Sequence, residues 1–195
     1  MSGNRNSFYL SDFNTVDEML LAAIKLIFTK KGDVYIYDDY IVYAHNFSKF
    51  DSIFLLKLLS IYSDRNKYTL DLIKRDSDII EVTVSKPKSF KIRFRDSLLL
   101  LKGSLKALGK SYTNDKKGIF PYLFVNNSVN PLDYVGDVPA FKYFSNITIN
   151  EYKLYCKSYR GKVWSLKDET IEYCLQDCIV LHRVLERFSY EIFTP

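Results

Sequence analysis

The first part of the chain predicts one strand and one amphipathic helix. Residues 8–10 form a short apolar run typical of a strand. Residues 16–28 predict a helix, which Ser11 or the pair Asn14-Thr15 can cap. Its apolar positions recur at helical spacing, namely Met19, Leu20, Ala23, Ile24 and Ile27.

Two extended segments and a second helix follow. Residues 34–37 and 40–44 are rich in β-formers, and Asp38-Asp39 separates them. The second segment lacks polar alternation, which predicts a central strand buried on both faces. Residues 50–62 then form a strongly apolar stretch that predicts a helix.

Residues 68–95 change to a period of two, with turn signals near residues 75–78 and 85–88. This pattern predicts an antiparallel meander of three strands. Its last strand points Lys91, Arg93 and Arg95 away from the apolar face. That basic face could contact DNA phosphates or be an ordinary solvated sheet face, and the second interpretation is the commoner one.

The remaining sequence predicts mainly helices. Residues 97–110 are helical with a candidate break at Gly103, and residues 112–150 are rich in loops. Two further helices are predicted at residues 148–160 and 165–190. The order of elements predicts an α/β fold with a mixed sheet and helices packed against it, in one domain.

Composition restricts the class of protein. A chain of 195 residues with 47% hydrophobic content can bury a core and is not a disordered protein. The net charge of +5 weakly favours a polyanionic partner. No apolar run reaches membrane-spanning length, so no membrane partner is expected.

The three cysteines, Cys156, Cys174 and Cys178, favour a reducing compartment over a disulfide framework. Buried helix cysteines are the favoured interpretation of Cys174 and Cys178, because further metal ligands are scarce nearby. Frequent Lys, Asn, Ile, Phe and Tyr, whose codons are mostly A/T-rich, suggest a mitochondrial or plasmid genome. The N-terminus shows neither a signal-peptide core nor an Arg-rich presequence.

Three residues are the first candidates for chemistry. Asp51 follows a predicted strand and opens a helix, a place where ligands gather in α/β sheets and where a carboxylate can bind Mg²⁺. Tyr173 and Asp177 lie one turn apart, on one face of the last helix. Taken singly, an Asp at a helix start is usually a cap, and a Tyr-x-x-x-Asp pair is usually surface decoration.

The ordered set of motifs resembles the exonuclease region of family B DNA polymerases of the protein-primed branch, found in small phages and linear mitochondrial plasmids. Three elements carry the resemblance: His45-Asn46-x-x-x-Phe50-Asp51, Ser104-Leu105-Lys106-Ala107-Leu108 and Tyr173-x-x-x-Asp177. The stretches at residues 94–98 and 117–122 are also similar to plasmid-type polymerases.

The resemblance implies an RNase H-like (DnaQ-like exonuclease) fold and a 3′–5′ exonuclease that uses two Mg²⁺ or Mn²⁺ ions. Asp51 and Asp177 would be metal ligands, and Tyr173 would orient the attacking water. Lys117 would lie near the scissile phosphate.

The resemblance also implies contacts with DNA. His45, Asn46 and Phe50 would hold the single-stranded 3′ end by hydrogen bonds and stacking. Ser104 and Leu105 would contact the single strand or a terminal priming protein.

The chain departs from the family pattern at the first exonuclease motif, because no Asp-x-Glu occurs in it. The nearest imitation, Asp12-Phe13-Asn14, is interpreted as a helix entry. Asp76-Ser77-Asp78, the only Asp-x-Asp, is interpreted as a turn and not as the polymerase motif.

We therefore expect a mitochondrial polymerase fragment that covers the exonuclease region, truncated at both ends and with little activity alone. A second chain could carry the missing parts. The alternatives are a non-catalytic module that binds single-stranded DNA or the priming protein, and an inactive relic.

Overall fold

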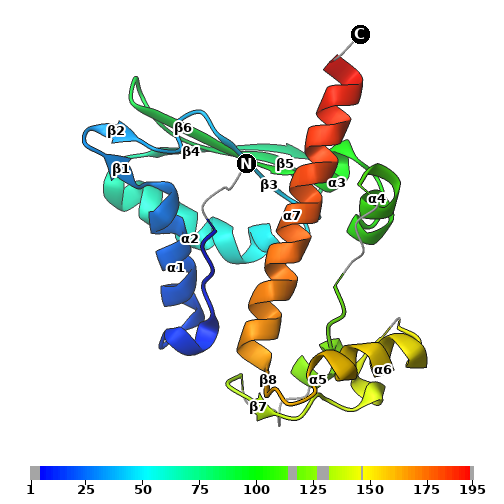
Figure 1. Cartoon of the computed structure of the whole chain (residues 1–195). Helices are drawn as coiled ribbons and strands as arrows, with labels where there is room; N and C mark the ends of the chain where they lie inside the picture. Colours follow the sequence, from blue (N-terminus) through cyan, green and yellow to red (C-terminus); the bar gives the residue numbers. More distant parts are fainter. Residues whose placement is uncertain (1–4, 114–117, 127–131, 146, 194–195) are drawn as a thin grey trace. The chain divides into compact units, whose positions relative to one another are not determined.

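The computed structural model describes residues 5–113, 118–126, 132–145 and 147–193, and it forms two compact units (Figure 1). Unit 1 comprises Met1–Asp12 and Gly109–Pro195, and unit 2 comprises Phe13–Leu108. Each unit has its own cluster of buried hydrophobic residues.

A mixed four-stranded sheet forms the centre of unit 2. Its order is β3-β6-β5-β4, with the bounds Ile41–Ala44, Phe90–Asp96, Asp78–Lys86 and Thr69–Arg75. β3 runs parallel to β6, whereas β6, β5 and β4 pair antiparallel in sequence. The predicted α/β class, mixed sheet and three-strand meander are confirmed.

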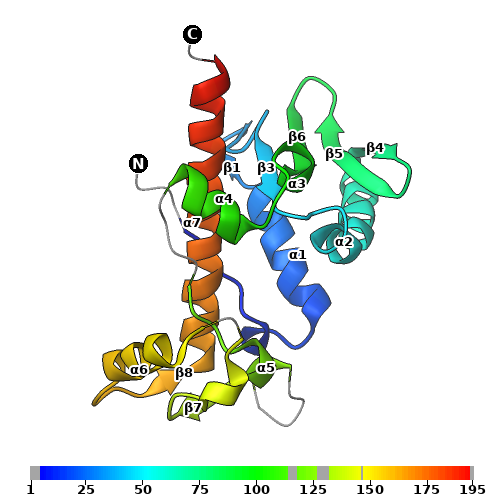
Figure 2. The same ribbon diagram turned by 90° about the vertical axis from the view of Figure 1, so that its right-hand side faces the viewer.

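Two helices cover one face of this sheet (Figures 1 and 2). α1 (Val16–Ile27) begins after Thr15, whose hydroxyl accepts a hydrogen bond from the Glu18 amide, and α2 is Asp51–Asn66. Alternate strand residues point toward the helices, and burying each such side chain is worth about 1.5–3 kcal/mol. The shared core includes Ile24, Phe28, Leu58, Leu59, Val82, Val84, Ile92 and Phe94.

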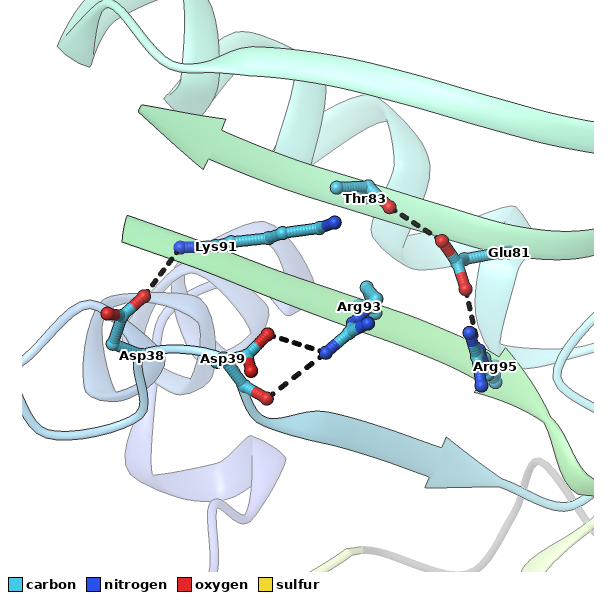
Figure 3. Close-up of polar contacts among 7 residues, drawn as sticks. All are labelled: Asp38, Asp39, Glu81, Thr83, Lys91, Arg93 and Arg95. Atoms are coloured by element: carbon cyan, nitrogen blue, oxygen red, sulfur yellow. Dashed lines mark hydrogen bonds and ion pairs between the residues drawn. The ribbon is translucent and has the colours of Figure 1, made fainter. Parts of the chain in front are cut away.

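The opposite face of the sheet carries paired charges (Figure 3). Arg95 Nε lies 2.6 Å from Glu81 Oε2, and Arg93 Nη2 lies 2.6 Å from Asp39 Oδ1. The Thr83 hydroxyl donates to Glu81 over 2.8 Å, and both of these residues are buried. Acidic partners therefore neutralise both arginines of the predicted basic face, which is neither a free cationic surface nor a simply solvated one.

β3 lies at the edge of the sheet, so the prediction of a central strand buried on both faces is wrong for unit 2. Ile41 is 36% exposed, and the other three residues are half-buried. The strand shows no polar alternation because the residue that it places on the charged face is an aromatic one. Val42 and Ala44 pack against the core, whereas Tyr43 is the register partner of Arg95, a residue of the charged face.

Other local predictions are corrected or confirmed. Residues 8–10 are not a strand, since Leu10–Asp12 forms a 3-10 turn (η1). The expected strand at 34–37 shortens to β2 (Val34–Tyr35), which pairs with β1 (Lys30–Lys31) in a hairpin. The predicted break at Gly103 is confirmed, because this residue has φ +135° between two short helices. These helices are α3 (Ser97–Leu100) and α4 (Leu105–Tyr112).

Unit 1 contains the long C-terminal helix α7 (Leu166–Phe193) and α6 (Ile149–Ser158), which a Thr148–Glu151 capping box opens. Both helices were predicted. The smaller elements are α5 (Tyr122–Val125), η2 (Phe141–Tyr143), and the paired strands β7 (Val135–Gly136) and β8 (Trp164–Ser165). Their core contains Phe120, Phe124, Trp164 and Leu166.

Cys174 and Cys178 are exposed on α7, so the prediction of buried helix cysteines is wrong for both. α7 is long, and only part of its surface packs. Its buried residues are Leu166, Val180, Leu181 and Val184. In the part of the chain that the structure describes, no helix has the length and apolar character needed to cross a membrane.

Glu81→Gln tests the charged face. Burial alone would raise the pKa of Glu81, but hydrogen bonds from Arg95 and Thr83 outweigh it, so the pKa lies below the usual value. A lowered folded-state pKa stabilises the fold above the unfolded pKa, and this stability is lost as the pH falls through the folded pKa.

We expect Glu81→Gln to lower the free energy of unfolding by about 1–2 kcal/mol at pH 7. The difference from the wild type should shrink below about pH 4. Urea denaturation followed by circular dichroism at both pH values measures this. A constant difference at all pH values would contradict the role assigned to the Glu81 charge.

Candidate functional site

Three predicted site residues of unit 2, His45, Asn46 and Phe50, lie in one loop, residues 45–50, which we call the binding loop. It follows β3 and leads into α2. The neighbouring parallel strand β6 ends beside it, since Ala44 pairs with Asp96. Carboxyl ends of parallel strands are the usual places for ligands in such sheets.

A buried carboxylate holds the binding loop. Asp96 is 4% exposed, and its Oδ1 accepts from the Asn46 amide at 2.9 Å. Its Oδ2 accepts from the Ser48 amide at 2.9 Å, and Oδ1 also accepts from the Leu98 amide at 2.8 Å. Three backbone donors compensate this carboxylate for the water that it loses on burial.

The rest of the binding loop is also anchored. Phe47 is 1% exposed and stacks on Phe94 with ring centroids 6.4 Å apart. The Ser48 hydroxyl accepts from the Ile79 amide at 2.7 Å. The backbone of the loop is therefore held at several points.

Both ring nitrogens of His45 are engaged within unit 2. Nε2 lies 2.9 Å from the carbonyl oxygen of Gly103, so this nitrogen carries the hydrogen and donates it. Nδ1 lies 3.0 Å from Ser97 Oγ. The hydrogen bonds to DNA expected of His45 would have to replace these contacts, whereas stacking on the ring would leave them intact.

Asn46 has a strained backbone and an unpaired side-chain oxygen. Its φ is 66°, in the left-handed region that asparagine tolerates better than most residues. Its Oδ1 is buried without a hydrogen-bond partner in unit 2. Buried unpaired carbonyl groups are uncommon and costly, which marks this atom as a candidate acceptor for a ligand.

Phe50 and Asp51 stand at the start of α2. Phe50 is 61% exposed and occupies the cap position without a side-chain cap hydrogen bond. Asp51 is the first helical residue, so it is not the N-cap of α2. Together they present an aromatic ring and a carboxylate next to Asn46 in sequence.

The carboxyl group of Asp51 lies in a partly apolar setting. Burial raises its pKa above the usual value; its own backbone N–H opposes this shift, and the negative charge of Asp96 adds to it. Asp51 also lines a cavity of about 170 Å³ between α1, α2 and the sheet. The cavity is otherwise lined by Ala23, Ile24, Ile27, Val42, Ala44, Phe47, Leu55, Leu59 and Phe94.

Ser104 and Leu105 lie at the start of α4. The Ser104 hydroxyl accepts from the Ala107 amide at 3.2 Å and so caps this helix. Ser104 is exposed, whereas Leu105 is half-buried. The adjoining residue Gly103 reaches the binding loop through His45.

Tyr173 and Asp177 lie one turn apart on α7 in unit 1. The Tyr173 ring lies 4.9 Å from the ring of Phe120, and its hydroxyl shares a short hydrogen bond with that of Tyr122. Burial is the largest cause that raises the pKa of Tyr173, followed by the Tyr122 hydrogen bond and the charge of Asp177. Tyr173 is therefore a protonated member of an aromatic cluster and not surface decoration.

A glycine packs closely against this cluster. A Cβ at Gly118 would lie 3.1 Å from Tyr173 Cδ2, which is tight for any side chain. The predicted residue Lys117 lies outside the described residues.

The predicted metal ligands are divided between the units, with Asp51 in unit 2 and Asp177 in unit 1. Asp96, whose charge acts on Asp51, is buried and already accepts three amide hydrogen bonds. Among the described residues, no three His, Cys, Asp or Glu side chains gather so that they could hold a metal ion. Neither unit alone thus fits a two-metal site.

The chain matches a known protein family over most of its length. The family described as DNA polymerase type B, organellar and viral, matches residues 32–194. The chain belongs to this family. The matched region includes every predicted site residue and excludes Asp12-Phe13-Asn14, so the resemblance to family B polymerases is confirmed.

Several polymerase relatives match nearly the whole chain. Probable DNA polymerases of Ascobolus immersus and Neurospora intermedia are each 34% identical, over 94% and 96% of this chain. A third, from Agaricus bitorquis, is 33% identical over 88% of it. The chain spans only 15%, 19% and 22% of the lengths of these three polymerases. No solved structure matches the chain.

The sequence did not single out Asp96, Ser97 or Gly103 as site residues. Asp96-Ser97 follows an alternating strand and precedes a helix, so it resembles an ordinary helix cap, and the Leu98 amide is indeed capped. The only signal was that residues 94–98 resemble plasmid-type polymerases.

Asp177→Asn tests the electrostatics of the unit 1 cluster. Because the negative charge of Asp177 raises the pKa of Tyr173, its removal should lower that pKa toward the usual value near 10. Carbon-13 NMR of tyrosine Cζ during a pH titration measures the change. Glu172→Gln removes a charge nearby on α7 and serves as the control. An equal shift in both variants would contradict a specific effect of Asp177.

Proposed function

We propose that the chain is the part of a type B DNA polymerase that holds the single-stranded 3′ end of DNA, in an exonuclease region of RNase H-like fold. The observation that carries this proposal is the anchored binding loop. It presents an exposed aromatic ring, Phe50, and a buried unpaired acceptor, Asn46 Oδ1. The matched family supports DNA as the polymer, and the parallel strand ends support the location.

The chemistry of the loop suits an unpaired nucleotide. The Phe50 ring can stack on a base, a contact worth about 1–3 kcal/mol. Asn46 Oδ1 can accept a hydrogen bond from a base amino group or a sugar hydroxyl. The His45 ring can add a second stacking surface while its nitrogens stay bound to Ser97 and Gly103.

The proposed function involves two further regions of the chain. Ser104 and Leu105 would contact the strand or a priming protein beside Gly103, whose carbonyl holds His45. Tyr173 and Asp177 would meet the terminal phosphate if a complete polymerase brings both units to one strand, with Lys117 near the same phosphate.

Hydrolysis by this chain alone is not part of the proposal. Mg²⁺ would bind through Asp51 and Asp177, but each unit contributes one of these carboxylates. One carboxylate per unit falls short of the ligands that two cations need. A second chain or a further segment would have to supply the rest.

Removal of the Asn46 side chain tests the binding function. We expect Asn46→Gly to weaken single-strand binding about tenfold, the loss typical of one hydrogen bond. Glycine adopts the left-handed backbone freely, so this variant does not add strain. Fluorescence anisotropy with a labelled oligonucleotide at two salt concentrations measures the affinity.

Asn66→Gly, at the exposed end of α2, and Asp51→Ala are the controls, and both should bind nearly as the wild type does. A wild-type chain without salt-sensitive affinity for single strands would overturn the proposed function.

Exonuclease activity provides a separate test. We expect the purified chain to leave a 3′-labelled single strand intact in the presence of Mg²⁺, because the ligand set is incomplete. Gel electrophoresis of the labelled strand over time measures this. Rapid trimming that Asp51→Ala abolishes would show that the chain holds its catalytic metals unaided.

A further inference from the structure

Asp96 lies outside the predicted motifs, yet it contacts the binding loop more than any other charged residue that the structure describes. Two of its three amide partners, Asn46 and Ser48, belong to that loop, and the third, Leu98, belongs to α3. The carboxylate is 4% exposed, so these contacts are shielded from water. One side chain therefore joins the end of β6, the start of α3 and the binding loop.

Burial and three amide hydrogen bonds favour a structural role for Asp96 over a role as a direct ligand. Oδ1 accepts two amide hydrogens and Oδ2 accepts one. A ligand at Oδ1 would have to displace amide donors and leave them buried and unpaired, and Oδ2 belongs to the same buried side chain. Asp96 is thus suited to position other residues.

The residue that Asp96 positions most directly is Asn46. The Asn46 backbone has φ 66°. This conformation costs free energy, so it persists only where the surrounding structure imposes it. Asp96 binds the amide of this strained residue at 2.9 Å and the amide two residues later at 2.9 Å. These bonds favour the one backbone arrangement that leaves Asn46 Oδ1 buried and unpaired.

We propose that Asp96 is a positioning residue for single-strand binding, which sets the backbone of Asn46 so that its side-chain oxygen meets the nucleotide. This inference rests on the proposed function of the binding loop. Ser97 supports the same loop by contacting His45 Nδ1 at 3.0 Å.

Two variants of Asp96 test the inference. Asp96→Asn replaces one acceptor oxygen with an amide donor, which opposes an N–H of the loop. Asp96→Ser keeps a side-chain oxygen that can cap α3 at Leu98, but this side chain is too short to bridge both loop amides. If Asp96→Asn does not fold, Asp96→Ser retains the helix cap and carries the test.

Glu81→Gln is the matched control. Glu81 is also a buried carboxylate of the same sheet, but it binds Arg95 and Thr83 and not the binding loop. It reports what loss of stability alone does to DNA binding. The dissociation constant and the fraction of binding-competent protein are both measured, by anisotropy titration at low and at stoichiometric concentration.

We expect both Asp96 variants to raise the dissociation constant about tenfold while the competent fraction stays near that of Glu81→Gln. Combining Asp96→Ser with Asn46→Gly should cost no more affinity than Asn46→Gly alone, because Asp96 acts through Asn46.

The outcomes separate the two proposals. A lower competent fraction with an unchanged dissociation constant would reduce Asp96 to a purely structural role and overturn the inference. Fully additive losses in the double variant would also overturn it. A wild-type chain that does not bind single strands would overturn the proposed function and this inference together.

Discussion

The carboxylate of Asp96 is the contact on which the candidate site depends. A buried carboxylate is stable only where donors replace its water, and here three backbone amides do so. This arrangement needs β3 and β6 in parallel register, with Ala44 beside Asp96. A shift of one residue in that register would turn the carboxylate away from the loop. The conformation of the binding loop therefore depends on the strand register of the sheet.

The two faces of the unit 2 sheet differ in chemical character. One face buries aliphatic and aromatic side chains under α1 and α2. The other pairs Arg93 and Arg95 with Asp39 and Glu81, so most of its positive charge is neutralised within the protein. A sheet face of this kind ties strands together and offers little attraction for phosphates. This is a physical reason to place the proposed DNA contact at the strand ends.

The chain belongs to the type B polymerase family, but its two expected acidic residues lie in different units. The chain corresponds to roughly a fifth of the Agaricus bitorquis polymerase and less of the other two relatives. Each unit carries one of the two expected acidic residues, and Asp96 is engaged in holding the binding loop. The proposed binding of a strand end would need only the loop of unit 2, whereas hydrolysis would need ligands beyond those of either unit.

The sequence by itself determined the elements that depend on neighbours along the chain. Alternation at residues 90–95 predicted β6, Thr148 predicted the start of α6, and Gly103 predicted the break between α3 and α4. The ordered motifs at residues 45–51, 104–108 and 173–177 pointed to the family. These signals are local, because period, capping and motif spacing act within a few residues.

Only the tertiary structure decided what surrounds the binding loop. Asp96 meets Asn46 and Ser48 across 50 and 48 residues, and His45 meets Ser97 and Gly103 across 52 and 58. The edge position of β3 and the pairing of Arg93 and Arg95 with acidic residues also depend on how the strands are arranged in the sheet. Contacts over such separations depend on which strands pair and in which register. Neither composition nor periodicity specifies that pairing, so a residue that looked like a helix cap proved to hold the site.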